Sequence, residues 1–186
     1  MIGFNTKDNE ILLAAMIQPD SIVDGPGIRT VIWTQGCTHN CKECHNPETH
    51  SINGGEYVSI DDICNQIKDN NQNITFSGGD PMLQPKQCAR VARCAKEQGL
   101  TVWAYTGFKF EYLVSLNNKD INEFLKLIDV LVDGPFDISK KSYECLYRGS
   151  TNQRLIDVQQ SLLKNTVTEW VNPYSTLATP SSSGLF

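Results

Sequence analysis

The chain has 186 residues, of which 40% are hydrophobic and 20% are charged, a composition typical of a soluble globular protein. A net charge of −5 and a pI near 5.2 argue against binding to nucleic acid or to anionic membranes, because both need a basic surface. No apolar run approaches the ~20 residues of a membrane span, and the N-terminus lacks the basic start of a signal peptide. We therefore expect a cytoplasmic protein.

The length predicts a single domain, which we place at residues 1–170. Residues 171–186 carry no charge and are rich in Ser, Thr and Pro. We expect this segment to be a flexible tail, because it has too little apolar surface to order itself.

Strand-like and helix-like segments alternate along the chain. Runs of β-branched and aromatic residues predict strands at 28–34, 73–76, 100–105 and 129–132. Apolar residues at helical spacing predict helices at 59–70, 84–98 and 110–128, the last one broken near Asn117 and Asn118. Such alternation is typical of an α/β domain with a mainly parallel sheet. Ligands gather at the carboxyl ends of parallel strands, so the Gly-rich and Cys-rich elements that follow these strands should converge on one edge.

Three of the seven cysteines stand close together, directly after the first predicted strand. Cys37, Cys41 and Cys44 form a CxxxCxxC array within one loop. Three soft thiolates on one loop can face one centre, and they select zinc or an iron–sulfur cluster over hard cations. A structural zinc site needs a fourth ligand, which one of three nearby histidines would have to supply: His39, His45 or His50. A 4Fe-4S cluster with only three cysteines leaves one iron open to a substrate or cofactor. We favour this interpretation because no second CxxC pair accompanies the array.

The other four cysteines show no such pattern. An odd total without an export signal argues against a disulfide framework. Cys64 and Cys88 lie on the apolar faces of predicted helices, where we expect core residues. Cys94 and Cys145 are isolated in the sequence, and we expect no chemistry from them.

A second candidate element, SGGDPM at Ser77–Met82, follows the second predicted strand. Alone it predicts a tight turn into the next helix. Beside a metal-binding loop it also suits a ligand, because Gly78 and Gly79 allow close approach to the backbone and Asp80 offers an acceptor for a cationic amino group. Arg29, at the start of the first strand, would either pair with a ligand carboxylate or be a solvated strand residue.

The order of five segments resembles a known family. DGPGIRTVIWTQGC, followed by the CxxxCxxC array, is similar to the glycyl-radical-enzyme activating enzymes, a branch of the radical S-adenosylmethionine superfamily. SGGDPM, VWAYTGF, VLVDGPF and RGSTNQRLIDV follow in order, and they resemble the members that act on anaerobic ribonucleoside-triphosphate reductase. The resemblance runs from Ile22 to Val158.

The resemblance implies a fold and a chemistry. The fold would be a partial (β/α) barrel of the radical S-adenosylmethionine type. Cys37, Cys41 and Cys44 would hold three irons of a 4Fe-4S cluster, and the fourth iron would chelate the methionine part of S-adenosylmethionine. The Gly-Gly-acidic element, here Gly78, Gly79 and Asp80, would contact the amino group of that cofactor. Reductive cleavage would give a 5′-deoxyadenosyl radical, which would generate a glycyl radical on the glycyl radical subunit of the reductase, and a flavodoxin-type reductant would supply the electron.

Two further expectations concern the adenine contacts and the partner. Many relatives place an aromatic residue before the third cysteine, where this chain has Glu43, so we expect His45 to stack on the adenine and count Glu43, Cys44 and His45 among the cofactor-binding residues. The segment Arg148–Val158 would either position the partner or be structural. Two alternatives are an activase of another glycyl radical enzyme such as pyruvate formate-lyase, and a non-catalytic zinc-binding interaction module.

Overall fold

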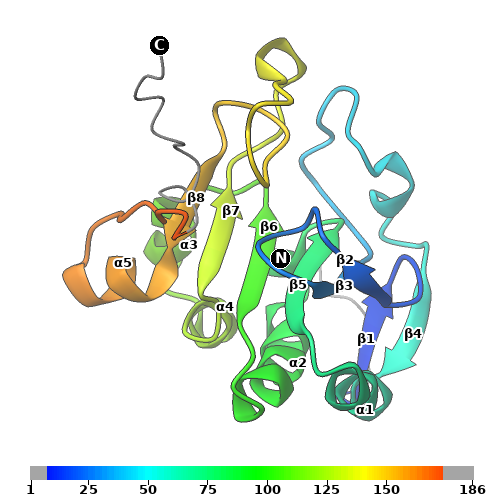
Figure 1. The fold of residues 1–186 in the computed structure, drawn as a ribbon. Coiled ribbons are helices and arrows are strands. Elements are labelled where there is room, and N and C mark those ends of the chain that lie inside the picture. The colour runs from blue at the N-terminus through cyan, green and yellow to red at the C-terminus, as the bar shows by residue number, and fades with distance from the viewer. Residues whose placement is uncertain (1–7, 174–186) are drawn as a thin grey trace, which may run out of the picture.

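The computed structural model describes residues 8–173, which fold around one eight-stranded sheet (Figure 1). The strand order is β4-β1-β3-β5-β6-β7-β8, and β2 also pairs with β3. The strands are β1 (Glu10–Leu13), β2 (Gln18–Ser21), β3 (Arg29–Thr34), β4 (Glu56–Ser59), β5 (Asn73–Gly78), β6 (Val102–Thr106), β7 (Val130–Asp133) and β8 (Arg154–Asp157).

The two faces of the sheet are covered differently. Helices α1 to α4 pack on one face, where their apolar side chains join Ile32, Phe76 and Leu131 in the main core. On the other face Trp103, Val130 and Val132 form a smaller cluster. The helices are α1 (Ile60–Asn70), α2 (Pro85–Glu97), α3 (Phe110–Ser115), α4 (Lys119–Leu125) and α5 (Val158–Lys164).

The centre of the sheet is parallel and its margins are antiparallel. β3, β5, β6 and β7 run parallel as neighbours. β1, β2, β4 and β8 are each antiparallel to a neighbour. The predicted α/β fold with a parallel sheet is therefore confirmed for the centre. Within residues 8–173 the outermost strands β4 and β8 do not pair with each other, so the sheet is open and is not closed into a barrel.

Each predicted strand and helix is present, with small shifts at the ends. The predicted helix 110–128 is divided into α3 and α4 near Asn117 and Asn118, as expected. Asn117 has a positive φ of 45°, and the Asn118 side chain accepts hydrogen bonds from the first N–H groups of α4. The sequence interpretation missed β1, β2, β4, β8 and α5.

Two expectations concern the ends of the chain and the membrane. The predicted tail at 171–186 lies outside the described residues from position 174 onward. Among the helices of residues 8–173, none combines the length and the apolar character needed to cross a bilayer.

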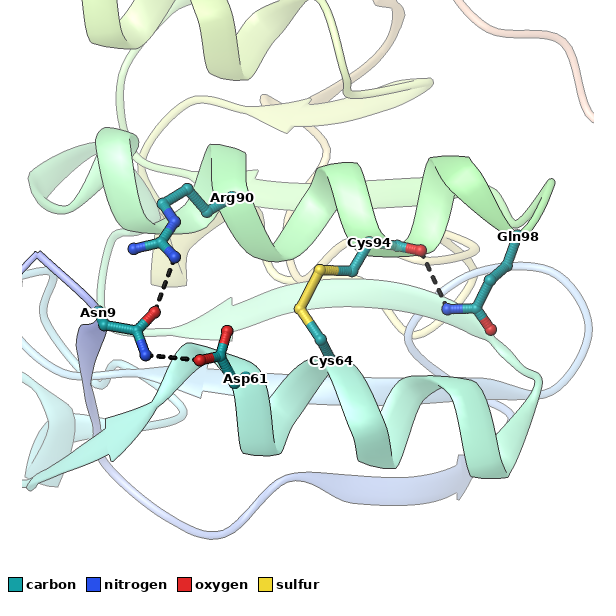
Figure 2. Close-up of a disulfide and its surroundings, with 6 residues drawn as sticks. All are labelled: Asn9, Asp61, Cys64, Arg90, Cys94 and Gln98. Atoms are coloured by element: carbon teal, nitrogen blue, oxygen red, sulfur yellow. Dashed lines mark hydrogen bonds between the residues drawn. A yellow bond between two sulfur atoms is a disulfide. The ribbon is translucent and has the colours of Figure 1, made fainter.

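A disulfide joins two of the cysteines to which we assigned no such role. Cys64 of α1 and Cys94 of α2 are bonded, with their Cα atoms 5.7 Å apart (Figure 2). The same helices are also joined through Asn9, whose side chain donates to Asp61 of α1 and accepts from Arg90 of α2, both at 2.7 Å. The expectation of unpaired cysteines at 64 and 94 is therefore wrong, because helix packing brings together residues that are 30 positions apart. Cys88 is fully buried in the core, as predicted.

Reduction of this disulfide should lower stability. A cross-link across 30 positions restricts the unfolded chain, and its loss is expected to reduce the free energy of unfolding by about 3–4 kcal/mol. Denaturant unfolding of the chain with and without reductant measures the difference. The double variant Cys64→Ser/Cys94→Ser should be equally unstable in both buffers, and a reductant effect that persists in it would contradict the assignment.

Arg29 is neither solvated nor directed at a ligand. Its side chain is fully buried at the amino end of β3, where Nε donates to Thr75 Oγ1 at 2.6 Å. Its remaining N–H groups donate to the carbonyl oxygens of Pro26, Ile74 and Thr101 and to the Thr101 hydroxyl. Burial lowers the pKa of the Arg29 guanidinium to about 10. Both expectations for this residue are therefore wrong.

Arg29→Lys should destabilise the fold although it keeps the charge. A single ammonium group cannot replace the guanidinium fork at several acceptors, so we expect a loss of about 2–3 kcal/mol in the free energy of unfolding. Urea unfolding measures this loss. Arg93→Lys is the matched control, because Arg93 is half exposed and its nearest contact to Glu123 is 3.8 Å. Equal stabilities of the two variants would contradict the role assigned to the Arg29 fork.

Candidate functional site

The three clustered cysteines lie in the loop that follows β3, residues 37–46, called the cysteine loop below. Its start is fixed by backbone hydrogen bonds from Gly36 N–H to Thr49 O at 2.8 Å and from Cys37 N–H to His50 O at 3.1 Å. A turn then brings Cys44 N–H to Cys41 O at 3.2 Å. The loop therefore leaves the sheet at the carboxyl end of β3, as predicted.

The cysteine thiols are free and half buried. Burial raises the pKa of the Cys37 thiol to about 11, with smaller contributions from Asp80, Cys41 and Cys44. Burial also raises the pKa of Cys41. Within residues 8–173 no three His, Cys, Asp or Glu side chains are already gathered around a metal-sized centre. The donor set itself, three soft thiols on one loop, fits an iron–sulfur cluster, and cluster binding would have to draw the sulfur atoms together and release their protons.

The Gly-Gly-Asp element lies at the carboxyl end of β5, directly beside the start of the cysteine loop. Gly79 N–H donates to Thr34 O at 2.7 Å, and Asp80 N–H donates to Gly36 O at 2.8 Å. Gly78 has a φ of +93°, which favours glycine. At Gly79 a Cβ would overlap the carbonyl group of Gly36. The two glycines therefore let the ends of β3 and β5 approach each other.

The Asp80 carboxylate points into the protein, where it is 1% exposed. It accepts hydrogen bonds from Met82 N–H at 3.0 Å and from Gly107 N–H at 3.0 Å. The Thr106 hydroxyl lies 2.9–3.0 Å from its two oxygens, and His39 Nε2 lies 2.9 Å from Oδ2. Segments after β3, β5 and β6 are thus joined at one carboxylate, as the predicted convergence requires.

The element after β7 continues the same edge. Gly134 N–H donates to Phe108 O at 3.1 Å. The buried Asp133 carboxylate accepts from Phe110 N–H and from the Arg154 guanidinium. Arg154 also binds Glu111, and its hydrogen bonds lower the pKa of Glu111 to about 2. Asp133 therefore anchors β8 and α3 rather than a ligand.

The segment Arg148–Val158 folds back on itself and on the β7 loop. The Gln153 side chain accepts from Gly149 N–H at 2.9 Å and donates to Gly134 O at 3.1 Å. Arg148 donates to Gln153 O at 2.9 Å. These contacts support the structural alternative for this segment.

A cavity of about 610 Å³ opens beside the cysteine loop. It is lined by residues from several strand ends and loops, among them Cys44, His45, Ser77, Tyr105, Phe136 and Gln153. Its volume lies in the range of small-molecule sites.

The predicted site residues take different positions around the cavity. Cys44 and His45 line it, and the His45 ring lies 4.7 Å from the Phe136 ring. Glu43 is exposed and is not among the residues that line the cavity. Sequence reasoning assigned no role to Tyr105, Phe136 or Cys145, which also line it, although VWAYTGF and VLVDGPF were noted as segments.

Comparison with known proteins decides the family. A family model described as a 4Fe-4S single cluster domain matches residues 23–156. The anaerobic ribonucleoside-triphosphate reductase-activating protein of Escherichia coli K12 is 34% identical over 146 residues, covering 73% of this chain and 92% of the relative. The chain belongs to this family of activating proteins. The matched range contains the cysteine loop and the Gly-Gly-Asp element, so both belong to an iron–sulfur domain.

Other members and a more distant activase are also similar. The protein of the same name from Enterobacteria phage T4 is 32% identical over 148 residues, covering 75% of this chain and 90% of the relative. The pyruvate formate-lyase-activating enzyme of Clostridium pasteurianum is 30% identical over 138 residues, covering 70% of this chain but 55% of the relative. This activase therefore extends well beyond the region that it shares with this chain.

Proposed function

We propose that the protein generates a glycyl radical on anaerobic ribonucleoside-triphosphate reductase, using a 4Fe-4S cluster and S-adenosylmethionine. The observation that carries this proposal is the CxxxCxxC loop at the carboxyl edge of the parallel strands, beside a cavity of about 610 Å³, in a chain of the activating-protein family. When bound, the cluster would supply the electron that cleaves S-adenosylmethionine and so produces the hydrogen-abstracting radical. The open sheet would then be the partial barrel of the radical S-adenosylmethionine type.

The residues of this chain would bind and shield the reactants. Cys37, Cys41 and Cys44 would hold the cluster, with Gly78, Gly79 and Asp80 as the backbone element next to it. The adenine would occupy the cavity near Cys44, against His45 and Phe136, with Glu43 at the outer side of the loop.

The cavity also contains a group suited to an anionic ligand atom. Arg148 lines the cavity, and within residues 8–173 its buried Nε has no hydrogen-bond partner. An acceptor such as the carboxylate of S-adenosylmethionine would satisfy this donor. The fit of the cavity to the cofactor therefore rests on volume, aromatic walls and an available cationic donor.

Two comparisons support the choice of partner. This chain matches relatives named as reductase-activating proteins over about nine-tenths of their length. The pyruvate formate-lyase-activating enzyme shares about half of its length with this chain, so its partner is the second candidate. A flavodoxin-type reductant would provide single electrons to the cluster.

The decisive experiment is anaerobic reconstitution. The chain is purified without oxygen, loaded with iron and sulfide, reduced with dithionite and mixed with S-adenosylmethionine. We expect 5′-deoxyadenosine by chromatography and, after addition of the reductase, a glycyl radical signal by electron paramagnetic resonance. A colourless zinc protein without cleavage would contradict the radical chemistry and would support the zinc-binding module. Cleavage of S-adenosylmethionine with a radical on pyruvate formate-lyase but none on the reductase would contradict the proposed partner and identify pyruvate formate-lyase in its place.

A further inference from the structure

The carboxylate of Asp80 has no capacity left for a ligand. A carboxylate offers about four lone-pair positions, and four protein donors face this one. These donors are the N–H groups of Met82 and Gly107, the Thr106 hydroxyl and the His39 ring. The side chain that the sequence suggests for a cofactor amino group is instead satisfied within the protein.

Among these donors, His39 alone comes from the cysteine loop, between Cys37 and Cys41. Its Nε2 faces Asp80 Oδ2 at 2.9 Å, and its side chain is 17% exposed. The ring meets the Phe108 ring edge-on, with 4.4 Å between centroids. It also covers Gly107 so closely that a Cβ at position 107 would overlap the ring. Three independent contacts therefore fix one side chain between the first two cysteines of the loop.

These contacts add to the others that tie the loop to the rest of the fold. Backbone hydrogen bonds hold its start at Gly36 and Cys37, and the backbone N–H of Phe136 donates to the Cys41 sulfur. The His39 contacts reach the segments that follow β5 and β6. A loop that is also held between its first two cysteines presents its thiols in fewer arrangements, which lowers the entropy lost when a cluster binds.

We propose that His39 is a positioning residue. Its hydrogen bond to the inward-turned carboxylate of Asp80 holds the cysteine loop against the ends of β5 and β6. The role rests on the proposed function in one respect, namely that the loop holds the cluster. It assigns the acidic residue of the Gly-Gly-Asp element to the loop rather than to the amino group of the cofactor.

Two substitutions at His39 separate the hydrogen bond from the bulk of the ring. In His39→Gln the amide nitrogen can take the place of Nε2 and donate to Asp80. His39→Leu has similar size but no donor. Asp80 is intact in both variants, so their difference reports the bridge and not a lost cofactor contact. His50→Leu is the matched control, because His50 lies just after the cysteine loop and, within residues 8–173, the hydrogen bonds found for it are made by its backbone groups, which the substitution keeps.

Hydrogen exchange of the full-length chain is the first measurement, with the cluster loaded and again without metal. In His39→Leu we expect the amides of residues 38–43 and of Gly107 to exchange about tenfold faster than in the wild type, while amides of the central strands are unchanged. His39→Gln should restore most of the protection. Unchanged loop exchange in His39→Leu, equal exchange in the Gln and Leu variants, or a uniform rise across the whole chain would each overturn the positioning role.

Iron retention is the second measurement. With a chelator present, His39→Leu should lose iron about tenfold faster than the wild type, and His39→Gln and His50→Leu should stay close to the wild type. Equal rates in all four proteins would overturn the role. A wild type that binds zinc or no iron would refute the proposed function instead, and the exchange of the metal-free chain would still decide the position of His39.

Discussion

A Cys41→Ala variant is expected to lose both cleavage of S-adenosylmethionine and radical formation on the reductase. Cys41 is the middle ligand of the array, and two thiols cannot hold a cluster that three ligands fix. We expect the iron content after reconstitution to fall from about four to below about one per chain, and the 5′-deoxyadenosine yield to fall to background. Iron and sulfide analysis and chromatography provide the two measurements.

Cys88→Ala is the control for Cys41→Ala. Cys88 is a free cysteine that is fully buried in α2, on the helix side of the sheet. Its replacement removes one buried thiol, at a cost of about 1 kcal/mol, and should leave the iron content unchanged. Normal cleavage by Cys41→Ala would contradict the cluster assignment, whereas equal iron loss in both variants would indicate a general effect of removing a thiol.

Gly79→Ala is expected to have the second largest effect, and it acts through the backbone. The new Cβ would overlap the carbonyl group of Gly36, directly before the first cysteine. Two backbone segments cannot relax as a side chain does, so we expect a destabilisation of about 3 kcal/mol and a displaced cysteine loop. The free energy of unfolding, measured with denaturant, and the retention of iron should therefore both decrease. Both are measured, because a thermal melt alone does not separate a loss of stability from a displaced cysteine loop.

Gly99→Ala is the control for Gly79→Ala, at the opposite end of the sheet. Gly99 has a φ of +75°, and a Cβ there would meet no described atom within 4 Å. Its substitution should lower stability by about 1 kcal/mol through backbone strain and leave iron retention unchanged. If Gly79→Ala behaved in the same way, the contact between the ends of β3 and β5 would not be needed for the site.

The parallel centre of the fold could be predicted because its segments are long and apolar. β3 and β5 are buried on both faces, and the helices between the central strands carry clear apolar stripes. The marginal strands are four residues long, and β2 has the sequence QPDS, which shows no apolar alternation. Their pairing depends on the neighbouring strand more than on their own residues.

The site was predictable in its position but not in the direction of its side chains. Spacing identified the cysteine loop and the Gly-Gly-Asp element, and strand order brought them together. The pattern of apolar and polar residues in the sequence does not show whether the Asp80 side chain faces a ligand or faces His39. The burial of Arg29 did have a signal, because a central parallel strand has no solvated face.

The joining of four strand ends has a consequence for the order of events during synthesis. The cysteines leave the ribosome first, and the groups that fix their loop follow at Asp80, at Thr106 and Gly107, and at Phe136. Contacts of such sequence separation form slowly and late. The nascent chain therefore carries three unsupported thiols until most of the sheet has assembled, and insertion of the cluster is a step that follows translation.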